Sequence, residues 1–201
     1  MNRLEKFFLT TGIIISSLIP LKLQAQYQED KNNDEEPTEF YYGSVGLSIK
    51  RLDNLALDKY FGAIFGMKGG VGLNTGKLSR IEFEAELAFK KNKNEDLELS
   101  TLGAGAYYDI VLNPNKKMIV YGGVGVKALS LILQENYQGN KSDQAKTSGI
   151  GFGIRGGVEG KIEKTSTLYL EISYDNISGT LDEETTNLSG SGLTFGLRTR
   201  F

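Results

Sequence analysis

The stretch Gly190–Phe201, which reads GSGLTFGLRTRF, decides the fold class that this sequence predicts. Every second residue counted back from the end is apolar with one exception, and this set is Leu193, Phe195, Leu197, Thr199 and Phe201. The opposite face carries Arg198 and Arg200 among glycine and threonine. A period of two predicts a β-strand. The pattern suits a strand with its apolar face toward lipid and its arginines toward a polar lumen. An exposed amphipathic strand of a soluble protein is the alternative.

The first 25 residues predict a secretory signal peptide. Arg3 and Lys6 precede an apolar run from Phe7 to Leu21, and cleavage is expected after Ala25. An uncleaved anchor is the alternative, but a spanning helix needs about 20 apolar residues. The next segment, residues 26–39 (QYQEDKNNDEEPTE), is acidic and predicts a disordered leader on the periplasmic side.

Composition is compatible with one exported domain. Removal of 25 residues from 201 leaves 176, enough for a single domain. The net charge then changes from -2 to -4, because the signal peptide carries three basic residues and one acidic residue, and nothing indicates a nucleic-acid partner. The absence of Cys excludes disulfides and a lipid-modified N-terminal Cys.

Period-two alternation recurs along the rest of the chain. It defines eight segments: Phe40–Lys50, Gly62–Asn74, Leu78–Lys90, Leu97–Leu112, Met118–Leu131, Thr147–Ile162, Thr167–Ile177 and Gly190–Phe201. Leu97 and Leu99 are out of phase with the fourth segment, which predicts a bulge or a loop boundary there. The predicted fold is all-β: an eight-stranded antiparallel up-and-down transmembrane β-barrel over residues 40–201.

The connections between these segments alternate strictly between short and long. The short ones are tight turns, namely Thr75–Lys77, Asn113–Lys117 and Glu163–Ser166. The others are mostly longer and polar, namely Arg51–Phe61, Lys91–Asp96, Ile132–Lys146 and Ser178–Ser189. This order is typical of outer-membrane barrels, which have short periplasmic turns and longer external loops.

Several motifs resemble one family. They are FYYGSVGLSI at Phe40, GAYYDI at Gly105, YGGVGVKA at Tyr121 and LTFGLRTRF at Leu193. Residues 40–201 resemble an eight-stranded bacterial outer-membrane β-barrel of the OmpA-like, opacity-protein and surface-antigen superfamily. The resemblance implies a protein of the cell outer membrane with lipid around it.

The end of the chain resembles the terminal signal that the outer-membrane assembly machinery recognises. This implies recognition through Phe201 together with Leu193, Phe195 and Leu197, although Thr199 departs from the pattern.

The polar faces of the segments predict a charged lumen. Its eight positive and seven negative residues are Lys50, Lys68, Arg80, Lys127, Arg155, Lys161, Arg198 and Arg200 against Glu82, Glu84, Glu86, Asp109, Glu159, Glu171 and Asp175. An eight-stranded barrel is just wide enough for side chains to fill, and buried charges are costly unless they are paired. We therefore expect a plugged lumen in which Glu82, Glu84 and Glu86 pair with cations. A catalytic or metal site built on these carboxylates is the alternative.

The side-chain inventory argues against an enzyme. Without His or Cys the chain lacks the usual base at neutral pH, the thiol nucleophile and the usual transition-metal ligands. Gly151–Gly156 matches GxGxxG, but it lies in an alternating segment with no helix after it, so it does not predict a phosphate loop. Calcium at Asp182, Glu183 and Glu184 is only weakly indicated. We expect no catalytic residue, no cofactor and no resident metal.

Three classes of function remain. The first is a structural, adhesive or antigenic surface protein that contacts a host or cell-surface ligand through its external loops. The second is a narrow porin-like channel for small solutes, with Glu82, Glu84 and Glu86 as selectivity residues. The third is a soluble lipocalin-type binding protein, which would place the apolar residues inside.

Overall fold

The computed structural model describes residues 39–92, 97–113, 117–137, 140–181 and 184–201. The predicted signal peptide and all but one residue of the predicted leader lie outside these ranges. The exception, Glu39, is the first residue of a strand. The elements are β1 (Glu39–Leu52), α2 (Leu55–Phe61), β2 (Ile64–Thr75), β3 (Ser79–Asn92), β4 (Leu97–Val111), β5 (Met118–Tyr137), β6 (Asn140–Lys161), β7 (Ser166–Leu181), β8 (Glu184–Asn187) and β9 (Gly190–Arg200).

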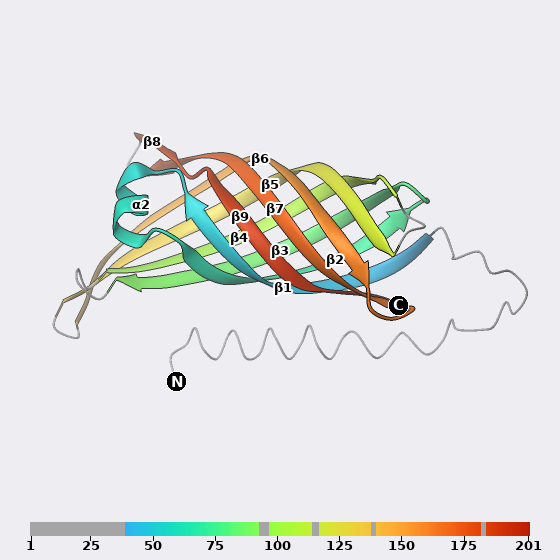
Figure 1. Cartoon of the computed structure of the whole chain (residues 1–201). Coiled ribbons are helices and arrows are strands. Elements are labelled where there is room, and N and C mark those ends of the chain that lie inside the picture. The colour runs from blue at the N-terminus through green and yellow to red at the C-terminus, as the bar shows by residue number, and fades with distance from the viewer. Residues whose placement is uncertain (1–38, 93–96, 114–116, 138–139, 182–183) are drawn as a thin grey trace, which may run out of the picture. The chain divides into compact units, whose positions relative to one another are not determined.

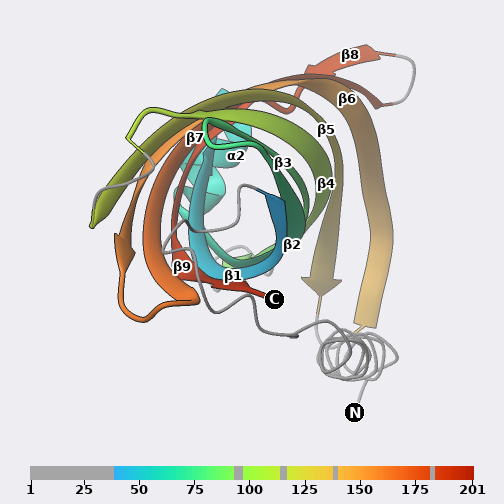
Figure 2. The same ribbon diagram turned by 90° about the vertical axis from the view of Figure 1, so that its right-hand side faces the viewer.

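Eight of these strands form a closed antiparallel barrel. Strands β1 to β7 pair in sequence order, and β9 pairs with both β7 and β1, which closes the ring. Figure 2 looks along the barrel and shows this ring with α2 at its far end. Within the described residues, the ninth strand, β8, pairs only with the end of β7. The predicted fold class is confirmed.

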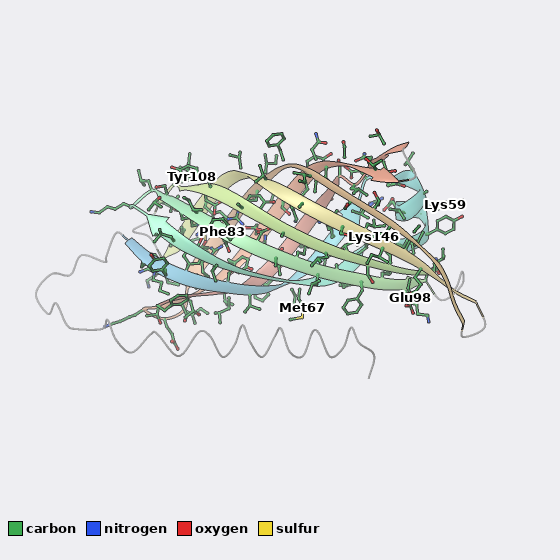
Figure 3. The ribbon with its side chains drawn as sticks, turned by 180° about the vertical axis from the view of Figure 1, so that it is seen from behind. Lys59, Met67, Phe83, Glu98, Tyr108 and Lys146 are labelled. Atoms are coloured by element: carbon green, nitrogen blue, oxygen red, sulfur yellow. The ribbon has the colours of Figure 1, made fainter. Side chains whose placement is uncertain are left out.

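The two faces of the barrel wall have opposite chemistry. Glu82, Glu84 and Glu86 are buried inside, whereas their neighbours Ile81 and Phe83 are exposed outside. Figure 3 shows Met67 and Phe83 on the outer wall. Soluble proteins rarely expose an apolar surface of this extent, so the outer wall is suited to lipid. The lipocalin alternative, which required apolar residues inside, is wrong. Among the elements described, no helix is long and apolar enough to cross a membrane.

One predicted loop contains a helix. Asn54 caps α2 by accepting hydrogen bonds from the amides of Ala56 and Leu57, both at 3.2 Å. Gly62 ends the helix with φ of 55°, a left-handed conformation that favours glycine. The helix lies at the end of the barrel where the long connections are (Figure 1), hereafter the loop end. The opposite end is the turn end.

A second predicted loop, residues 132–146, is largely a β-hairpin. The pairing of β5 with β6 continues from Ile132–Lys146 to Tyr137–Asn140, with one register shift after Gln134. By contrast, β7 accompanies β6 only as far as Ser148. The hairpin therefore extends beyond the barrel wall at the loop end, as Figure 1 shows.

Of the two features predicted at Leu97 and Leu99, the bulge is wrong, whereas β4 does begin at Leu97. Strand β4 pairs in unbroken register with β3 from Leu97 to Ile110 and with β5 from Leu97 to Val111. Leu99 is fully buried and faces the lumen. The lumen is apolar at this height, where buried residues form what we call the loop-end apolar layer: Leu52, Phe61, Ile64, Ala88, Leu99, Leu129, Leu131, Ile177 and Leu188. The change of phase in the sequence therefore marks the place where the side chains that fill the lumen change from apolar to charged.

Candidate functional site: the charged lumen

The structure brings together most of the charged residues predicted for the lumen. Thirteen of the fifteen are buried: Lys50, Lys68, Arg80, Glu82, Glu84, Glu86, Asp109, Lys127, Arg155, Glu159, Glu171, Asp175 and Arg198. The other two, Lys161 and Arg200, are half-buried near the turn end. The guanidinium carbon of Arg200 lies 3.9 Å from the ring centre of Phe40.

Nearest the loop end, two lysines share two carboxylates. Lys127 Nζ lies 2.8 Å from Glu86 and 2.9 Å from Asp175. Lys50 Nζ contacts the same carboxylates at 3.3 and 3.4 Å. Tyr107 donates its hydroxyl to Asp175 at 3.0 Å. The two positive charges in this group balance the two negative ones.

A second balanced group occupies the middle of the lumen. Lys68 Nζ lies 2.6 Å from Glu84 and 2.5 Å from Glu171. Arg155 approaches the same carboxylates with Nη1, at 3.0 and 3.6 Å. Tyr121 donates to the other oxygen of Glu171 at 2.8 Å.

Three carboxylates and two arginines form the group nearest the turn end. Arg80 binds Asp109 at 2.7 Å and Glu159 at 2.5 Å. Arg198 binds Glu82 at 2.9 Å and also pairs with Glu159. Arg155 reaches this group as well, at 2.7 Å from Asp109 and 2.9 Å from Glu82. This residue therefore joins the middle group to the turn-end group.

Four buried tyrosines line the same lumen, and the prediction of site residues did not include them. Each is directly opposite a glycine on the next strand: Tyr42–Gly72, Tyr107–Gly125, Tyr121–Gly157 and Tyr169–Gly196. A Cβ on any of these glycines would overlap the opposing ring. Arginines stack on these rings, with Cζ 4.0 Å from the centre of Tyr121 for Arg80 and 4.3 Å from Tyr107 for Arg155. The signal in the sequence was the alternation of Tyr and Gly on polar faces.

Apolar residues lie beyond the charges at the loop end and beside them at the turn end. At the loop end, α2 packs Phe61 into the loop-end apolar layer, with Leu57 against its side. At the turn end, Val111 and Ile119 form a smaller buried cluster with Tyr121. The charged groups thus have an apolar layer on their loop-end side and a small apolar cluster beside the group nearest the turn end, where Ile119 is directly opposite Glu159.

Contacts at the loop end hold α2 in place. Arg51 donates two hydrogen bonds to Asp58, both at 2.7 Å, and this bonding lowers the pKa of the Asp58 carboxyl. Lys90 donates to the carbonyl of Ala63 at 2.7 Å, and Asn92 donates to that of Tyr60 at 2.8 Å.

The chemistry of the lumen is that of ion pairing. Each buried carboxylate named above lies within 4.0 Å of at least one lysine or arginine. Removing one partner of such a pair leaves an uncompensated buried charge, which costs about 3–5 kcal/mol. The arrangement supports a structural role for the network.

The residues of the predicted assembly signal occupy the outer face of the last strand. Leu193, Phe195, Leu197 and Phe201 are all exposed there. The amide of Phe201 donates to the carbonyl of Tyr41 at 3.0 Å, which joins the end of the chain to β1. Recognition by the assembly machinery stays a prediction.

Comparison with known proteins agrees with this architecture. The family described as outer membrane protein beta-barrel domain matches residues 16–201. No curated protein sequence matches the chain.

Solved structures of outer-membrane proteins share the fold. Neisserial surface protein A (NspA) is 19% identical, with 83% of this chain and 100% of that chain covered and a TM-score of 0.61. Ail of Yersinia pestis, solved in complex with the heparin analogue sucrose octasulfate, is 12% identical over 83% and 100%, with a TM-score of 0.57. OprG of Pseudomonas aeruginosa is 9% identical over 83% and 97%, with a TM-score of 0.55.

Proposed function

The chain belongs to the outer membrane protein beta-barrel domain family, and from this premise we propose that it is a non-enzymatic surface protein with a closed barrel. In this proposal the barrel is a rigid scaffold in the membrane. The elements at the loop end make adhesive or antigenic contacts with a host or cell-surface ligand.

The observation that carries the proposal is the filling of the lumen. Thirteen buried charged side chains pair with one another, four tyrosines pack among them, and an apolar layer lies at the loop end. A narrow channel would need a continuous polar path past these pairs and through the loop-end apolar layer. The filled lumen favours the surface role over the channel.

The loop end offers a suitable contact surface. The hairpin of β5 and β6 extends beyond the barrel wall and keeps its backbone pairing to Tyr137–Asn140. The short helix α2 presents Leu55 and Tyr60 to solvent while its other side is buried. Binding residues on preformed elements lose less conformational entropy when a ligand binds.

Exchange of the hairpin tests the proposal. Replacement of Gln134–Asp143 by a short Gly-Ser linker should abolish adhesion of bacteria displaying the barrel to epithelial cells, because it removes the protruding contact surface. The matched control replaces Glu163–Thr165, a connection at the turn end, and should adhere as the unaltered chain does. Both variants should keep the difference in gel mobility between boiled and unboiled samples that marks a folded barrel. Undiminished adhesion without the hairpin, in a folded barrel, would contradict the role given to this element.

A further inference from the structure

The barrel closes where its first and last strands pair. Strand β1 meets β9 along a register that runs from Tyr42–Arg200 to Leu52–Gly190, and we call this interface the closing seam. Every other interface of the ring joins strands that follow one another in the chain, with only β8 interposed between β7 and β9. The strands of the closing seam are separated in the chain by all the others. Because the entropic cost of joining two segments rises with the length of chain between them, this interface costs the most to form again after it opens.

One carboxylate bonds two residues that face each other across the closing seam. Ser44 of β1 is directly opposite Arg198 of β9. Both donate to Glu82 of β3, Ser44 Oγ to Oε1 at 2.7 Å and Arg198 Nη2 to Oε2 at 2.9 Å. All three residues are buried. Glu82 therefore holds one residue on each side of the closing seam.

A glycine leaves the space for this contact. Strand β2 lies between β1 and β3, and its residue Gly70 is directly opposite Ser44. A Cβ on Gly70 would lie 2.9 Å from both Ser44 Oγ and Glu82 Oε1, closer than packed side chains tolerate. The carboxylate of Glu82 can therefore reach over β2 to the closing seam. Arg155 of β6 also donates to Glu82 Oε2, at 2.9 Å, and helps to fix its position.

A tyrosine covers the closing seam beside this contact. Gly46 of β1 and Gly196 of β9 are directly opposite each other. A Cβ on Gly46 would lie 2.7 Å from Tyr169 Oη, and a Cβ on Gly196 would lie 2.7 Å from Cε1 of the same ring. Tyr169 belongs to β7, so its side chain extends over β9 to β1. Arg198 lies against this ring, with Cζ 4.9 Å from the ring centre.

We propose that Ser44, Glu82 and Arg198 form a clamp that holds the closing seam shut, and that the wall opens at this seam when the clamp is lost. Separation of β1 from β9 breaks the hydrogen bond from at least one of the two donors to Glu82. The clamp is a conformational device of the barrel wall. It does not involve the contact surface at the loop end, so this proposal and the proposed adhesive function can fail independently.

Hydrogen exchange of the refolded barrel tests the clamp. Ser44→Ala removes the donor on β1 and should raise the exchange rates of the amides between β1 and β9 about tenfold, as expected for the loss of a hydrogen bond to a charged group. The interface of β4 with β5, the farthest from the closing seam in the ring, should keep its rates. The matched control is Ser48→Ala on the same strand, because Ser48 Oγ is buried and has no hydrogen-bond partner within the described residues. This control should leave exchange at the closing seam unchanged.

A cross-link distinguishes opening of the closing seam from a general loss of stability. Val45 and Leu197 are directly opposite on its outer face, and a disulfide can bridge the Cα spacing of paired strands, about 4.5–5.5 Å. The chain has no Cys of its own, so Val45→Cys with Leu197→Cys introduces a single possible disulfide. Its oxidation in the Ser44→Ala variant should restore slow exchange at the closing seam.

Three results would overturn the clamp. The first is equal exchange at the closing seam in Ser44→Ala and Ser48→Ala. The second is an increase of the same size between β4 and β5, which would show that Ser44 stabilises the barrel as a whole. The third is fast exchange at the closing seam that persists after the disulfide has formed.

Discussion

Arg155 is the residue that joins the lumen network. Its guanidinium group donates to Glu82, Glu84 and Asp109 at 2.7–3.0 Å, and its side chain is fully buried. These carboxylates come from two strands, β3 and β4. A single side chain of β6 therefore connects the middle group to the turn-end group.

Replacement of Arg155 should destabilise the barrel strongly. Arg155→Met leaves several carboxylates without their central partner, so we expect the free energy of unfolding to fall by about 3–5 kcal/mol. Urea unfolding in detergent, followed by gel mobility, measures it. The control is Arg51→Met, which breaks the exposed pair with Asp58 and should change the midpoint little. Equal midpoints for the two variants would show that the network contributes no more than a surface pair.

The pairing of tyrosine with glycine gives a second prediction at this scale. A methyl group on Gly72 would overlap the ring of Tyr42, so Gly72→Ala should destabilise the barrel by about 1–3 kcal/mol. Gly69→Ala on the same strand is the control, because its nearest neighbour would be the carbonyl oxygen of Ser44 at an ordinary 3.7 Å. The midpoints of urea unfolding of the two variants measure this difference, and Gly72→Ala should have the lower midpoint. Similar values would mean that the tyrosine moves aside at no cost.

Among the elements, the sequence predicted the strands within the membrane better than the structures beyond it. Period-two alternation located all eight barrel strands because lipid and lumen impose opposite chemistry on alternate residues. That constraint ends where the strands leave the membrane. Strand β5 therefore continues six residues past its predicted end at Leu131, to Tyr137, without an apolar alternation to mark it. The helix α2 has only seven residues, fewer than hydrophobic periodicity can identify.

The attachment of α2 should respond to acid through Asp58. The bonds to Arg51 lower the pKa of this carboxyl in the folded protein. The stabilisation of α2 by the pair is therefore complete above the pKa of the unfolded chain, about 3.9, and it is lost as the pH falls through the pKa of the folded protein. We expect the hydrogen-exchange protection of the Gly62 amide, which bonds to the Asp58 carbonyl, to stay constant from pH 7 to 5 and to fall below that range.

Two variants give the control for this response. Asp58→Asn should show the low protection already at pH 7, because it cannot form the ion pair. Lys59→Gln, which changes an exposed charge on the same helix, should keep the protection of the unaltered chain. A protection factor in Asp58→Asn equal to that of Lys59→Gln at pH 7 would rule out a role for the pair.

For the whole molecule, thirteen of the fifteen charged residues assigned to the polar faces are buried, because alternation fixes which side chains point inward. Alternation does not predict whether charged or apolar side chains fill the lumen at a given position along the barrel axis. The inward positions of Leu99, Leu129 and Ile177 belong to the loop-end apolar layer, which the prediction of a lumen plugged by charges did not include. The partners of each carboxylate were also beyond prediction, since they depend on the tilt of the strands and on side-chain length.

The central claim is that this barrel is closed. An apolar layer fills the loop end of its lumen, and its buried carboxylates are paired, so the barrel should not conduct ions. The direct measurement is the conductance of the refolded barrel in a planar lipid bilayer, after the shift in gel mobility has shown that it is folded, with a general porin in the same set-up to establish sensitivity. We expect no steps above background from the barrel. Reproducible conductance steps that depend on Glu82, Glu84 and Glu86 would contradict a closed lumen and identify a channel.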